Sequence, residues 1–313
     1  MSTAFVFPGQ GSQAVGMGRA LADAFGAARL VFEEVDEALG QRLSRLMFEG
    51  PDADLTLTEN AQPALMAVSL AAVRVLESEG GWRLADKASF VAGHSLGEYS
   101  ALAAAGALTL ADAARLLKRR GRAMQRAVPV GAGAMAALLG LDLVAAAEVA
   151  AAAAEGEVCA CANDNAPGQV VVSGDKAAVE RAVKIAGEKG AKRSVLLPVS
   201  APFHCPLMAP AAREMEEALA AVDLRPPVVP LVANVTALPV SDPETIRGQL
   251  VRQVTDMVRW RESVLRLKSD GVLRLLELGA GKVLSGLAKR IDRELESLAV
   301  GQPADVEPVL KAL

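Results

Sequence analysis

The sequence predicts an α/β protein with a parallel-sheet core, interrupted by a small inserted unit of mixed strands and helices. Apolar runs alternate with helical patterns over residues 4–124 and again over 231–290, as in parallel sheets with crossover helices. Between them, residues 131–199 change to a β-α-β-β-α-β order, the ferredoxin-like pattern. The chain has 313 residues, 52% of them hydrophobic, which suffices for one or two compact cores. We therefore expect a core formed by residues 1–130 and 200–313, with residues 131–199 as an inserted subdomain.

The first third of the chain predicts two core strands, each ending in a loop. The apolar run 4–7 stops at Pro8 and continues as a Gly-rich loop, and the run 88–92 leads directly into the motif G-H-S-L-G at 93–97. Helical spacing of apolar residues, turn signals and helix-forming residues predict the helices between and after these strands. These helices are 21–30, 31–46, 60–78, 98–105 and 110–124.

The inserted unit is predicted from its capping residues as well as from its apolar runs. Asp142 and Asp175 stand where N-caps belong, and Gly156 and Gly190 stand where helices should end. Its strands are 134–139, 158–162, 169–173 and 193–199, and its helices are 143–155 and 175–189. The last third returns to the core pattern, with strands at 231–235 and 273–278 and helices at 243–254, 260–269 and 283–290.

Composition excludes several classes of function. The 33 basic and 37 acidic residues give a net charge of −4, and only 3% of residues are aromatic, which argues against a nucleic-acid partner. The uncharged stretch 194–212 contains four prolines, so it is predicted as loop and strand and not as a membrane span. The N-terminus lacks the positive region of a signal peptide. We expect a soluble cytoplasmic protein with no membrane partner, and a monomer by default.

Cysteine and histidine counts argue against disulfides and metals. Three cysteines are an odd number in a chain with a large apolar core, which fits a reducing compartment. The spacing of Cys159 and Cys161 is wrong for a zinc knuckle, and the chain has only two histidines. We expect no metal site.

The motif at 93–97 fits the G-x-S-x-G nucleophile elbow, and it lies between a predicted strand and a predicted helix. Side chains two positions before or after Ser95 would collide in so tight a turn, which explains the two glycines. The turn exposes the Ser95 hydroxyl, and the following helix directs its N-terminal N–H groups toward it. The alternative, a structural turn, is weaker because of this context.

A nucleophilic serine needs a base, and the chain offers only His94 and His204. Side chains of adjacent residues on an elbow point apart, which makes His94 a poor base for Ser95. His204 lies in a Pro-rich segment after the last strand of the insert, and we prefer it over the alternative of a surface histidine. Cys205 beside it is interpreted as a filler residue, because only His204 could lower its pKa.

Five basic residues follow the elbow within nine positions. They form either a solvated helix end or, for some of them, a site for a phosphate or carboxylate. The Gly-rich loop at 7–13 lacks the ending of a phosphate loop, but it can supply a backbone N–H to an oxyanion hole. The five are Lys118, Arg119, Arg120, Arg122 and Arg126.

In order and spacing, these motifs resemble the family of malonyl-CoA:acyl carrier protein transacylases, which includes the acyltransferase domains of polyketide and fatty acid synthases. The resemblance covers essentially the whole chain. Its markers are Phe7-Pro8-Gly9-Gln10-Gly11-Ser12-Gln13, Gln62-Pro63-Ala64-Leu65, Gly93-His94-Ser95-Leu96-Gly97-Glu98-Tyr99, Arg120-Gly121 with Met124-Gln125, Phe203-His204, and Gly279-Ala280-Gly281-Lys282-Val283-Leu284.

The resemblance implies a hydrolase-like α/β core with a ferredoxin-like insert. It also implies that Ser95 attacks the thioester of malonyl-CoA while His204 takes its proton. Backbone N–H groups of Leu96 and Gln10 would hold the oxyanion. The malonyl group would then pass to the phosphopantetheine thiol of acyl carrier protein. Malonyl-CoA is thus a substrate, and no permanently bound cofactor is implied.

The remaining site residues are also assigned by the resemblance. A backbone carbonyl at Gln253 would orient His204 in place of a carboxylate, and this is the loosest of the matches. Arg120 would pair with the free carboxylate of the malonyl group, and Gln62 would line the same pocket. Phe203 beside the base resembles the residue that accompanies malonyl selectivity in related acyltransferases.

Three alternatives stay open at this point. A serine thioesterase or esterase would share the elbow and the base, but it has no use for Arg120 or for the Gly-Gln loop. A noncatalytic module that binds CoA or a carrier protein would not need Ser95 and His204. A freestanding acyltransferase of a polyketide pathway would share every motif. Carrier proteins are acidic, so a basic docking patch is expected, with candidates Lys189, Lys192, Arg193, Lys282, Lys289 and Arg290.

Overall fold

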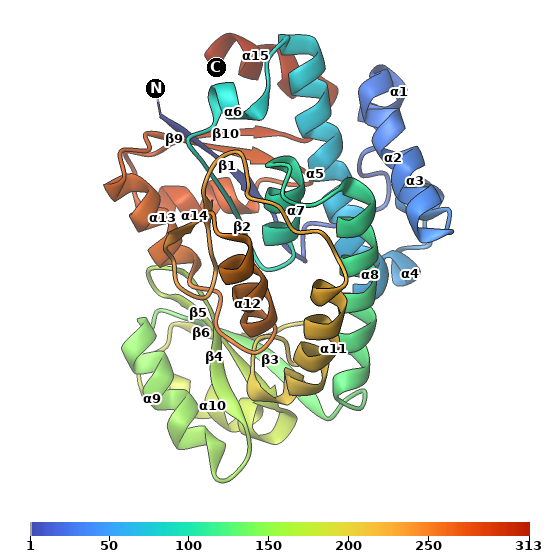
Figure 1. The fold of residues 1–313 in the computed structure, drawn as a ribbon. Helices are drawn as coiled ribbons and strands as arrows, with labels where there is room; N and C mark the ends of the chain where they lie inside the picture. The colour runs from blue at the N-terminus through green and yellow to red at the C-terminus, as the bar shows by residue number, and fades with distance from the viewer. Residues whose placement is uncertain (1) are drawn as a thin grey trace.

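The structure is a computed structural model that describes residues 2–313, and it contains a six-stranded and a four-stranded sheet (Figure 1). The larger sheet has the order β10-β9-β1-β2-β7-β8, and every pair is parallel except β7 with β8. This confirms the predicted α/β class with a parallel-sheet core. The strands are β1 (Thr3–Phe7), β2 (Phe90–Gly93), β7 (Leu231–Val232), β8 (Pro239–Val240), β9 (Arg274–Leu278) and β10 (Glu296–Val300).

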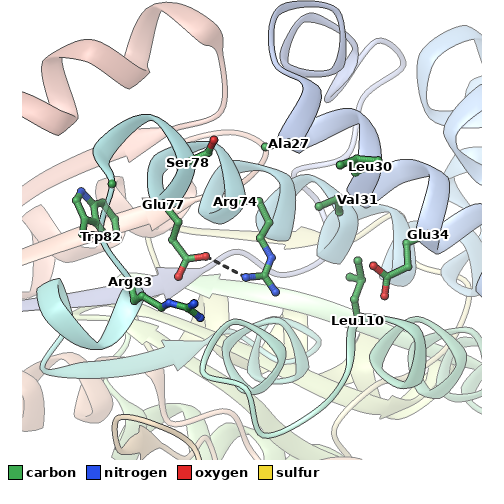
Figure 2. Close-up of a pocket in the computed structure, with 11 residues that line it drawn as sticks. Ala27, Leu30, Val31, Glu34, Arg74, Glu77, Ser78, Trp82, Arg83 and Leu110 are labelled. Carbon is green, nitrogen blue, oxygen red and sulfur yellow. Dashed lines mark hydrogen bonds and ion pairs between the residues drawn. The ribbon is translucent and has the colours of Figure 1, made fainter.

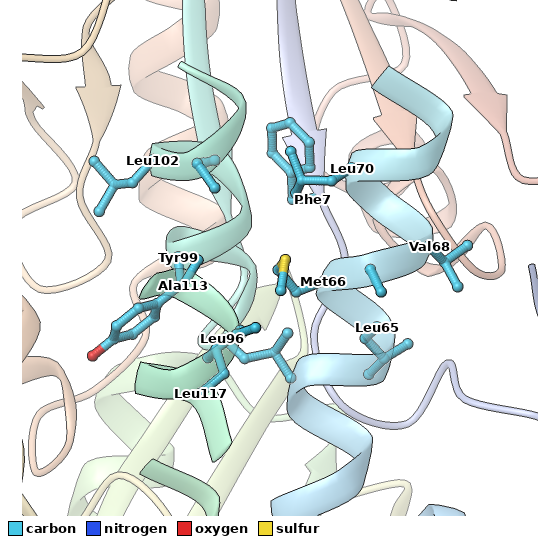
Figure 3. Close-up of a cluster of buried hydrophobic side chains, with 14 of the residues drawn as sticks. Phe7, Leu65, Met66, Val68, Leu70, Leu96, Tyr99, Leu102, Ala113 and Leu117 are labelled. Carbon is cyan, nitrogen blue, oxygen red and sulfur yellow. The ribbon is translucent and has the colours of Figure 1, made fainter. Parts of the chain in front are cut away.

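Strand β1 lies in the middle of this sheet and is buried along its whole length. Side chains alternate across a strand, so β1 serves two cores. Ala4 and Val6 pack in a cluster with Trp260, whereas Phe5 and Phe7 pack in the large cluster on the other face. Figure 3 shows Phe7 in this large cluster, near Met66 and Leu70. Helices on both faces explain why the strand is an unbroken apolar run.

Two long helices form much of the scaffold that surrounds the elbow. Helix α5 (Thr58–Gly80) is buried over most of its first sixteen residues, and α8 (Leu110–Ala127) packs against it. Figure 1 shows α8 running from the core toward the second sheet. The other helices of the core are α1 (Arg19–Ala24), α2 (Gly26–Leu39), α3 (Leu43–Glu49), α4 (Asp52–Thr56), α6 (Leu84–Lys87), α7 (Gly97–Ala104), α11 (Ala209–Ala220), α12 (Pro243–Gln253), α13 (Trp260–Ser269), α14 (Val283–Ile291) and α15 (Pro303–Ala312).

The second sheet is antiparallel, with the order β4-β5-β3-β6, and it has the predicted β-α-β-β-α-β sequence of elements. In β3, Ala136 and Leu138 face a core shared with α9 and α10, whereas Met135 and Ala137 join the large cluster of the main core. The boundaries at 131 and 199 stay a prediction. The elements are β3 (Gly133–Leu139), α9 (Leu143–Ala154), β4 (Cys159–Ala166), β5 (Gln169–Asp175), α10 (Lys176–Glu188) and β6 (Arg193–Leu196).

Several predicted boundaries are wrong. The helices predicted at 21–30 and 31–46 break at Phe25 and Gly40 instead; Gly40 has a φ of 56° and ends α2. The strand predicted at 193–199 ends at Leu196. Asp142 caps α9 as predicted, but Asp175 accepts a hydrogen bond from the Val158 N–H instead of capping α10.

Elements α11, β10 and α15 were not predicted, although the buried residues Ala211, Met215, Ala218 and Leu219 of α11 have helical spacing. Within residues 2–313, none of the helices combines the length and the apolar composition that crossing a lipid bilayer requires.

Candidate active site

Ser95 lies in a sharp turn between β2 and α7, with a φ of 53°. The two flanking glycines are required by contact distances. A Cβ at Gly93 would lie 1.9 Å from the backbone of Gly97, and a Cβ at Gly97 would lie 2.2 Å from the carbonyl oxygen of Phe7. Backbone atoms cannot move aside as a flexible side chain can. The strained turn therefore presents the serine hydroxyl at the carboxyl end of the sheet.

His204 is brought to Ser95 from a loop between β6 and α11. Its Nε2 lies 2.8 Å from Ser95 Oγ, and its Nδ1 lies 2.8 Å from the backbone carbonyl oxygen of Gln253. The carbonyl only accepts hydrogen bonds, so Nδ1 carries the proton and Nε2 is free to accept one from the serine. Gln253 is the last residue of α12, and its carbonyl occupies the place that a carboxylate has in a Ser-His-Asp triad.

Burial and a nearby positive charge keep the His204 imidazole neutral. Burial is the main cause that lowers its pKa, the Arg120 guanidinium adds to it, and together they bring the pKa to about 3. The residue is 4% exposed. A neutral imidazole at pH 7 is the form that a general base needs.

Arg120 is a fully buried arginine on α8 that reaches the serine. One of its terminal nitrogens donates to Gln62 Oε1 at 2.7 Å, and the other donates to Gln253 Oε1 at 2.9 Å and to Ser95 Oγ at 3.2 Å. Burial lowers its pKa, and Tyr99 and then Glu98 act against that shift. Its Nε is buried and has no hydrogen-bond partner within the described residues. The guanidinium thus keeps unused donor capacity beside the Ser95 hydroxyl.

Two backbone N–H groups are available for an oxyanion. Leu96 directly precedes α7, and Gln10 lies in the loop after β1; both residues line the cavity at Ser95. Within residues 2–313, neither N–H donates to another protein atom. The N–H of Ser95 itself donates to Asn234 Oδ1 at 2.8 Å, so it is not available. The side chain of Gln10 accepts from the Thr58 hydroxyl at 2.8 Å, which fixes the loop against α5.

A cavity of about 440 Å³ opens at Ser95 between the two sheets. Its polar end holds the serine, His204 and Arg120, and its apolar wall includes Phe203, which is 9% exposed. The lining residues are Gln10, Gly11, Gln13, Thr56, Gln62, His94, Ser95, Leu96, Arg120, Met124, Met135, Asn163, Leu197, Pro198, Val199, Phe203 and His204. The size and mixed lining suit an acyl group attached to a long polar carrier.

A second cavity, of about 550 Å³, lies away from this chemistry between α2, α5 and the segment before α6 (Figure 2). Figure 2 shows its charged side chains, of which Arg74 and Glu77 form an ion pair of 3.0 Å. None of the residues that line it belongs to the Ser95 cavity. The residues that line it include no hydroxyl or thiol hydrogen-bonded to a histidine. The candidate active site is therefore the Ser95 cavity.

The remaining sequence candidates lie elsewhere or have other partners. His94 points its Nε2 at Asn165 Oδ1, 2.8 Å away, and burial lowers its pKa. Burial raises the pKa of the Cys205 thiol, which fits an unreactive filler residue. Of the five cations on α8, Arg120 alone lines the cavity, whereas the other four form ion pairs with Glu59, Glu214 or Glu217.

Sequence reasoning missed two buried residues under the elbow. Asn234 follows β7, accepts from the Ser95 N–H and donates to the Gly93 carbonyl at 2.6 Å, so it locks the turn. Glu98 belongs to a quoted motif, but the sequence assigned it no role. Its carboxylate accepts from Gln253 Nε2 at 2.7 Å. A polar residue at the end of an apolar strand was the available signal for Asn234.

Comparison with known proteins agrees with this geometry. The family model of the acyl transferase domain matches residues 4–301. The chain is 46% identical to a malonyl CoA-acyl carrier protein transacylase of Bacillus subtilis, over 99% of this chain and 96% of that one. An acyl-carrier-protein S-malonyltransferase of Bartonella henselae is 56% identical over 100% and 99% of the two chains, with a TM-score of 0.97.

A malonyl-transacylase solved in complex with its type II PKS acyl-carrier protein is 43% identical, with a TM-score of 0.97 and full coverage of both chains. These likenesses run from end to end and agree with the motif order of the sequence. The chain therefore belongs to the acyl transferase family and, within it, to the malonyl CoA-acyl carrier protein transacylases.

Proposed function

We propose that Ser95, His204 and Arg120 carry out the reaction of this family. The protein transfers the malonyl group of malonyl-CoA to the phosphopantetheine thiol of acyl carrier protein, through a malonyl-serine intermediate, for fatty acid biosynthesis. The observation that carries the assignment is that Ser95 Oγ lies 2.8 Å from His204 Nε2 and 3.2 Å from a nitrogen of Arg120. The oxygen atom proposed as the nucleophile thus contacts both the proposed base and the arginine proposed to bind the substrate carboxylate.

In the first half-reaction, Ser95 Oγ attacks the thioester carbonyl while His204 Nε2 takes the hydroxyl proton. The negative charge that develops on the carbonyl oxygen is held by the N–H groups of Leu96 and Gln10. Collapse of the tetrahedral intermediate breaks the C–S bond, and the imidazolium returns its proton to the departing CoA thiolate. The Gln253 carbonyl stabilises the imidazolium through Nδ1–H.

Arg120 recognises the free carboxylate at the other end of the malonyl group. A guanidinium binds a carboxylate through two parallel N–H donors, which fixes the acyl chain in direction as well as position. Gln62 holds one side of this guanidinium and lines the same pocket. An acyl group held at its far end leaves little room for water, which favours transfer over hydrolysis.

In the second half-reaction, the carrier-protein thiol enters where CoA left. His204 takes the thiol proton, the thiolate attacks the ester carbonyl, and Ser95 Oγ leaves with the proton from His204. The same base, His204, therefore acts in both half-reactions. Phe203 stands beside this base and limits the space at the acyl α-carbon, which selects malonyl over branched groups.

The partners follow from this chemistry. Malonyl-CoA is the donor and acyl carrier protein the acceptor, as in the relative solved with its carrier protein. The groups that the reaction needs are supplied by side chains and backbone, so the proposal includes no resident cofactor or metal. We place the protein in the cytoplasm and take a monomer as the functional unit.

Replacement of the nucleophile tests the function. Ser95→Ala should form no malonyl adduct in intact-protein mass spectrometry, yet it should still bind malonyl-CoA in calorimetry. A stable adduct of normal stoichiometry in this variant would contradict the assignment. In the same assay, wild-type protein without carrier protein should not consume malonyl-CoA beyond one equivalent, whereas a thioesterase would continue to turn over.

A further inference from the structure

Glu98 is a buried carboxylate under the elbow that the proposed chemistry does not use. It lies on α7, three residues after the nucleophile, and is 1% exposed. Its Oε2 accepts hydrogen bonds from Gln253 Nε2 at 2.7 Å and from the Asn234 backbone N–H at 3.3 Å. A buried carboxyl group is costly and is retained where its charge or its acceptors have a role.

The side chain of Gln253 joins this carboxylate to Arg120. Its Nε2 donates to Glu98 and also to the Ser95 carbonyl oxygen at 2.9 Å, while its Oε1 accepts from Arg120 at 2.9 Å. Two acceptors thus hold the NH₂ end of the amide, so the oxygen end must face the guanidinium. The same residue holds His204 through its backbone carbonyl, so the position of Gln253 affects both the base and the receptor.

Charge compensation for Arg120 is indirect. Among residues 2–313, no carboxylate forms an ion pair with this buried guanidinium. The charge of Glu98 nevertheless acts on it: besides Tyr99, Glu98 is the group that raises the pKa of Arg120 against the effect of burial. The amide between the two charges occupies one donor of a terminal nitrogen, but it leaves Arg120 Nε without a partner among the described residues and so available to a substrate carboxylate.

We propose that Glu98 is a positioning residue for malonyl recognition. It orients Gln253, and it compensates the charge of Arg120 from a distance that leaves the guanidinium open to the substrate. The inference rests on the proposed function, since it requires Arg120 to bind the malonyl carboxylate. It assigns two separable contributions to one side chain, namely the hydrogen bond that holds Gln253 and the negative charge that competes with the substrate.

Two substitutions separate these contributions. Glu98→Gln keeps the shape and an acceptor but removes the charge, whereas Glu98→Ala removes both. Glu277→Gln is the matched control: Glu277 is also 1% exposed and accepts from the backbone N–H groups of Leu284 and Ser285, but it forms no hydrogen bond with Gln253 or Arg120. Steady-state transfer from malonyl-CoA and from acetyl-CoA to acyl carrier protein is measured at pH 8, above the Glu98 pKa of about 7 that burial produces.

In Glu98→Gln, KM for malonyl-CoA should fall about three- to tenfold, the effect of one screened charge, with kcat and the acetyl-CoA KM unchanged. In Glu98→Ala, kcat should fall about ten- to a hundredfold with both thioesters, because Gln253 loses its anchor. Glu277→Gln should change neither quantity. The inference is overturned if Glu98→Gln shifts both KM values equally or neither, or if Glu98→Ala, when folded, keeps the wild-type kcat.

Arg120→Ala, assayed in parallel, separates this inference from the function beneath it. If Arg120→Ala loses its preference for malonyl-CoA while Glu98→Gln has wild-type constants, only the role of Glu98 is wrong. If Arg120→Ala keeps the preference, the proposed function of Arg120 is wrong, and the role of Glu98 falls with it.

Discussion

Ser95 and His204 both have a left-handed backbone conformation, with φ of 53° and 56°, and their side chains meet at 2.8 Å although 109 residues separate them. Non-glycine residues rarely adopt this conformation, and it costs on the order of 1–3 kcal/mol at each position. Serine is not among the residues that favour it, whereas histidine adopts it more often than most, together with Asn and Asp. The tight turn imposes this conformation on Ser95, and these two left-handed residues are the ones that we propose for the chemistry.

Arg120→Ala should invert the substrate preference. A malonyl carboxylate left unpaired in a partly buried pocket loses about 2–5 kcal/mol, roughly 30- to several-thousand-fold in kcat/KM. Acetyl-CoA has no carboxylate, so its loss should be small. The measurement is kcat/KM for both thioesters in both proteins. An equal decrease for the two substrates would mean that Arg120 has a structural role or contacts CoA.

His204 should stay neutral at mildly acidic pH. Its pKa is about 3 in the folded protein, so the imidazole should not protonate between pH 7.5 and 5. In the unfolded chain His204 protonates near pH 6.5, whereas in the folded protein it does not. The free energy of unfolding should therefore decrease as the pH falls from about 6.5 toward 3. Nitrogen NMR shifts of the two imidazoles, assigned with His204→Ala, check this directly. A titration midpoint near 6.5 for His204 would contradict the prediction.

Phe203→Ser should broaden the acyl specificity. The ring lines the cavity beside the base, and a serine there would leave room for a methyl group on the α-carbon. One methyl group in a pocket is worth about 1–3 kcal/mol, some 10- to 200-fold, so selectivity is expected to be substantial but incomplete. We expect the variant to gain methylmalonyl transfer with little change for malonyl, measured as kcat/KM for both. An unchanged ratio would place the specificity elsewhere in the pocket.

Gly121→Ala should weaken malonyl binding by moving α8. A Cβ at Gly121 would lie 2.5 Å from Glu59 Cα and 2.6 Å from the Thr58 carbonyl oxygen, so α8 must shift away from α5. The shift separates Arg120 from Gln62 and costs about 1–3 kcal/mol of stability. We expect a lower urea midpoint and a higher KM for malonyl-CoA.

Gly248→Ala is the control for this substitution, because Gly248 is also a helical glycine but has open space around its Cβ position. It should raise stability by about 0.5–1 kcal/mol and leave KM unchanged. Equal behaviour of the two variants would show that the close approach at Gly121 does not position Arg120.

Local sequence patterns predicted the elements that have strong hydrophobic periodicity or clear turn and capping residues. The strand-turn-helix around Ser95 and the β-α-β-β-α-β order of the insert are both readable, because glycines, caps and apolar runs act over a few residues. The end of α2 at Gly40 was missed although a glycine in the left-handed conformation is a local helix-ending signal, whereas strand β10 lies at the edge of the sheet and depends on its pairing with β9.

The amino-acid sequence was sufficient to predict the fold class, and it reduced the candidates for nucleophile and base to Ser95 and His204, since the chain has only two histidines and one nucleophile-elbow motif. For Arg120 and for the Gln253 carbonyl the sequence offered only a resemblance, and the packed structure supplied their contacts, including the hydrogen bond from Arg120 to the Gln253 amide oxygen that the sequence did not predict. It also revealed Glu98 and Asn234 under the elbow. The physical reason is that burial and hydrogen-bond direction arise from segments far apart in the chain, which no local pattern records.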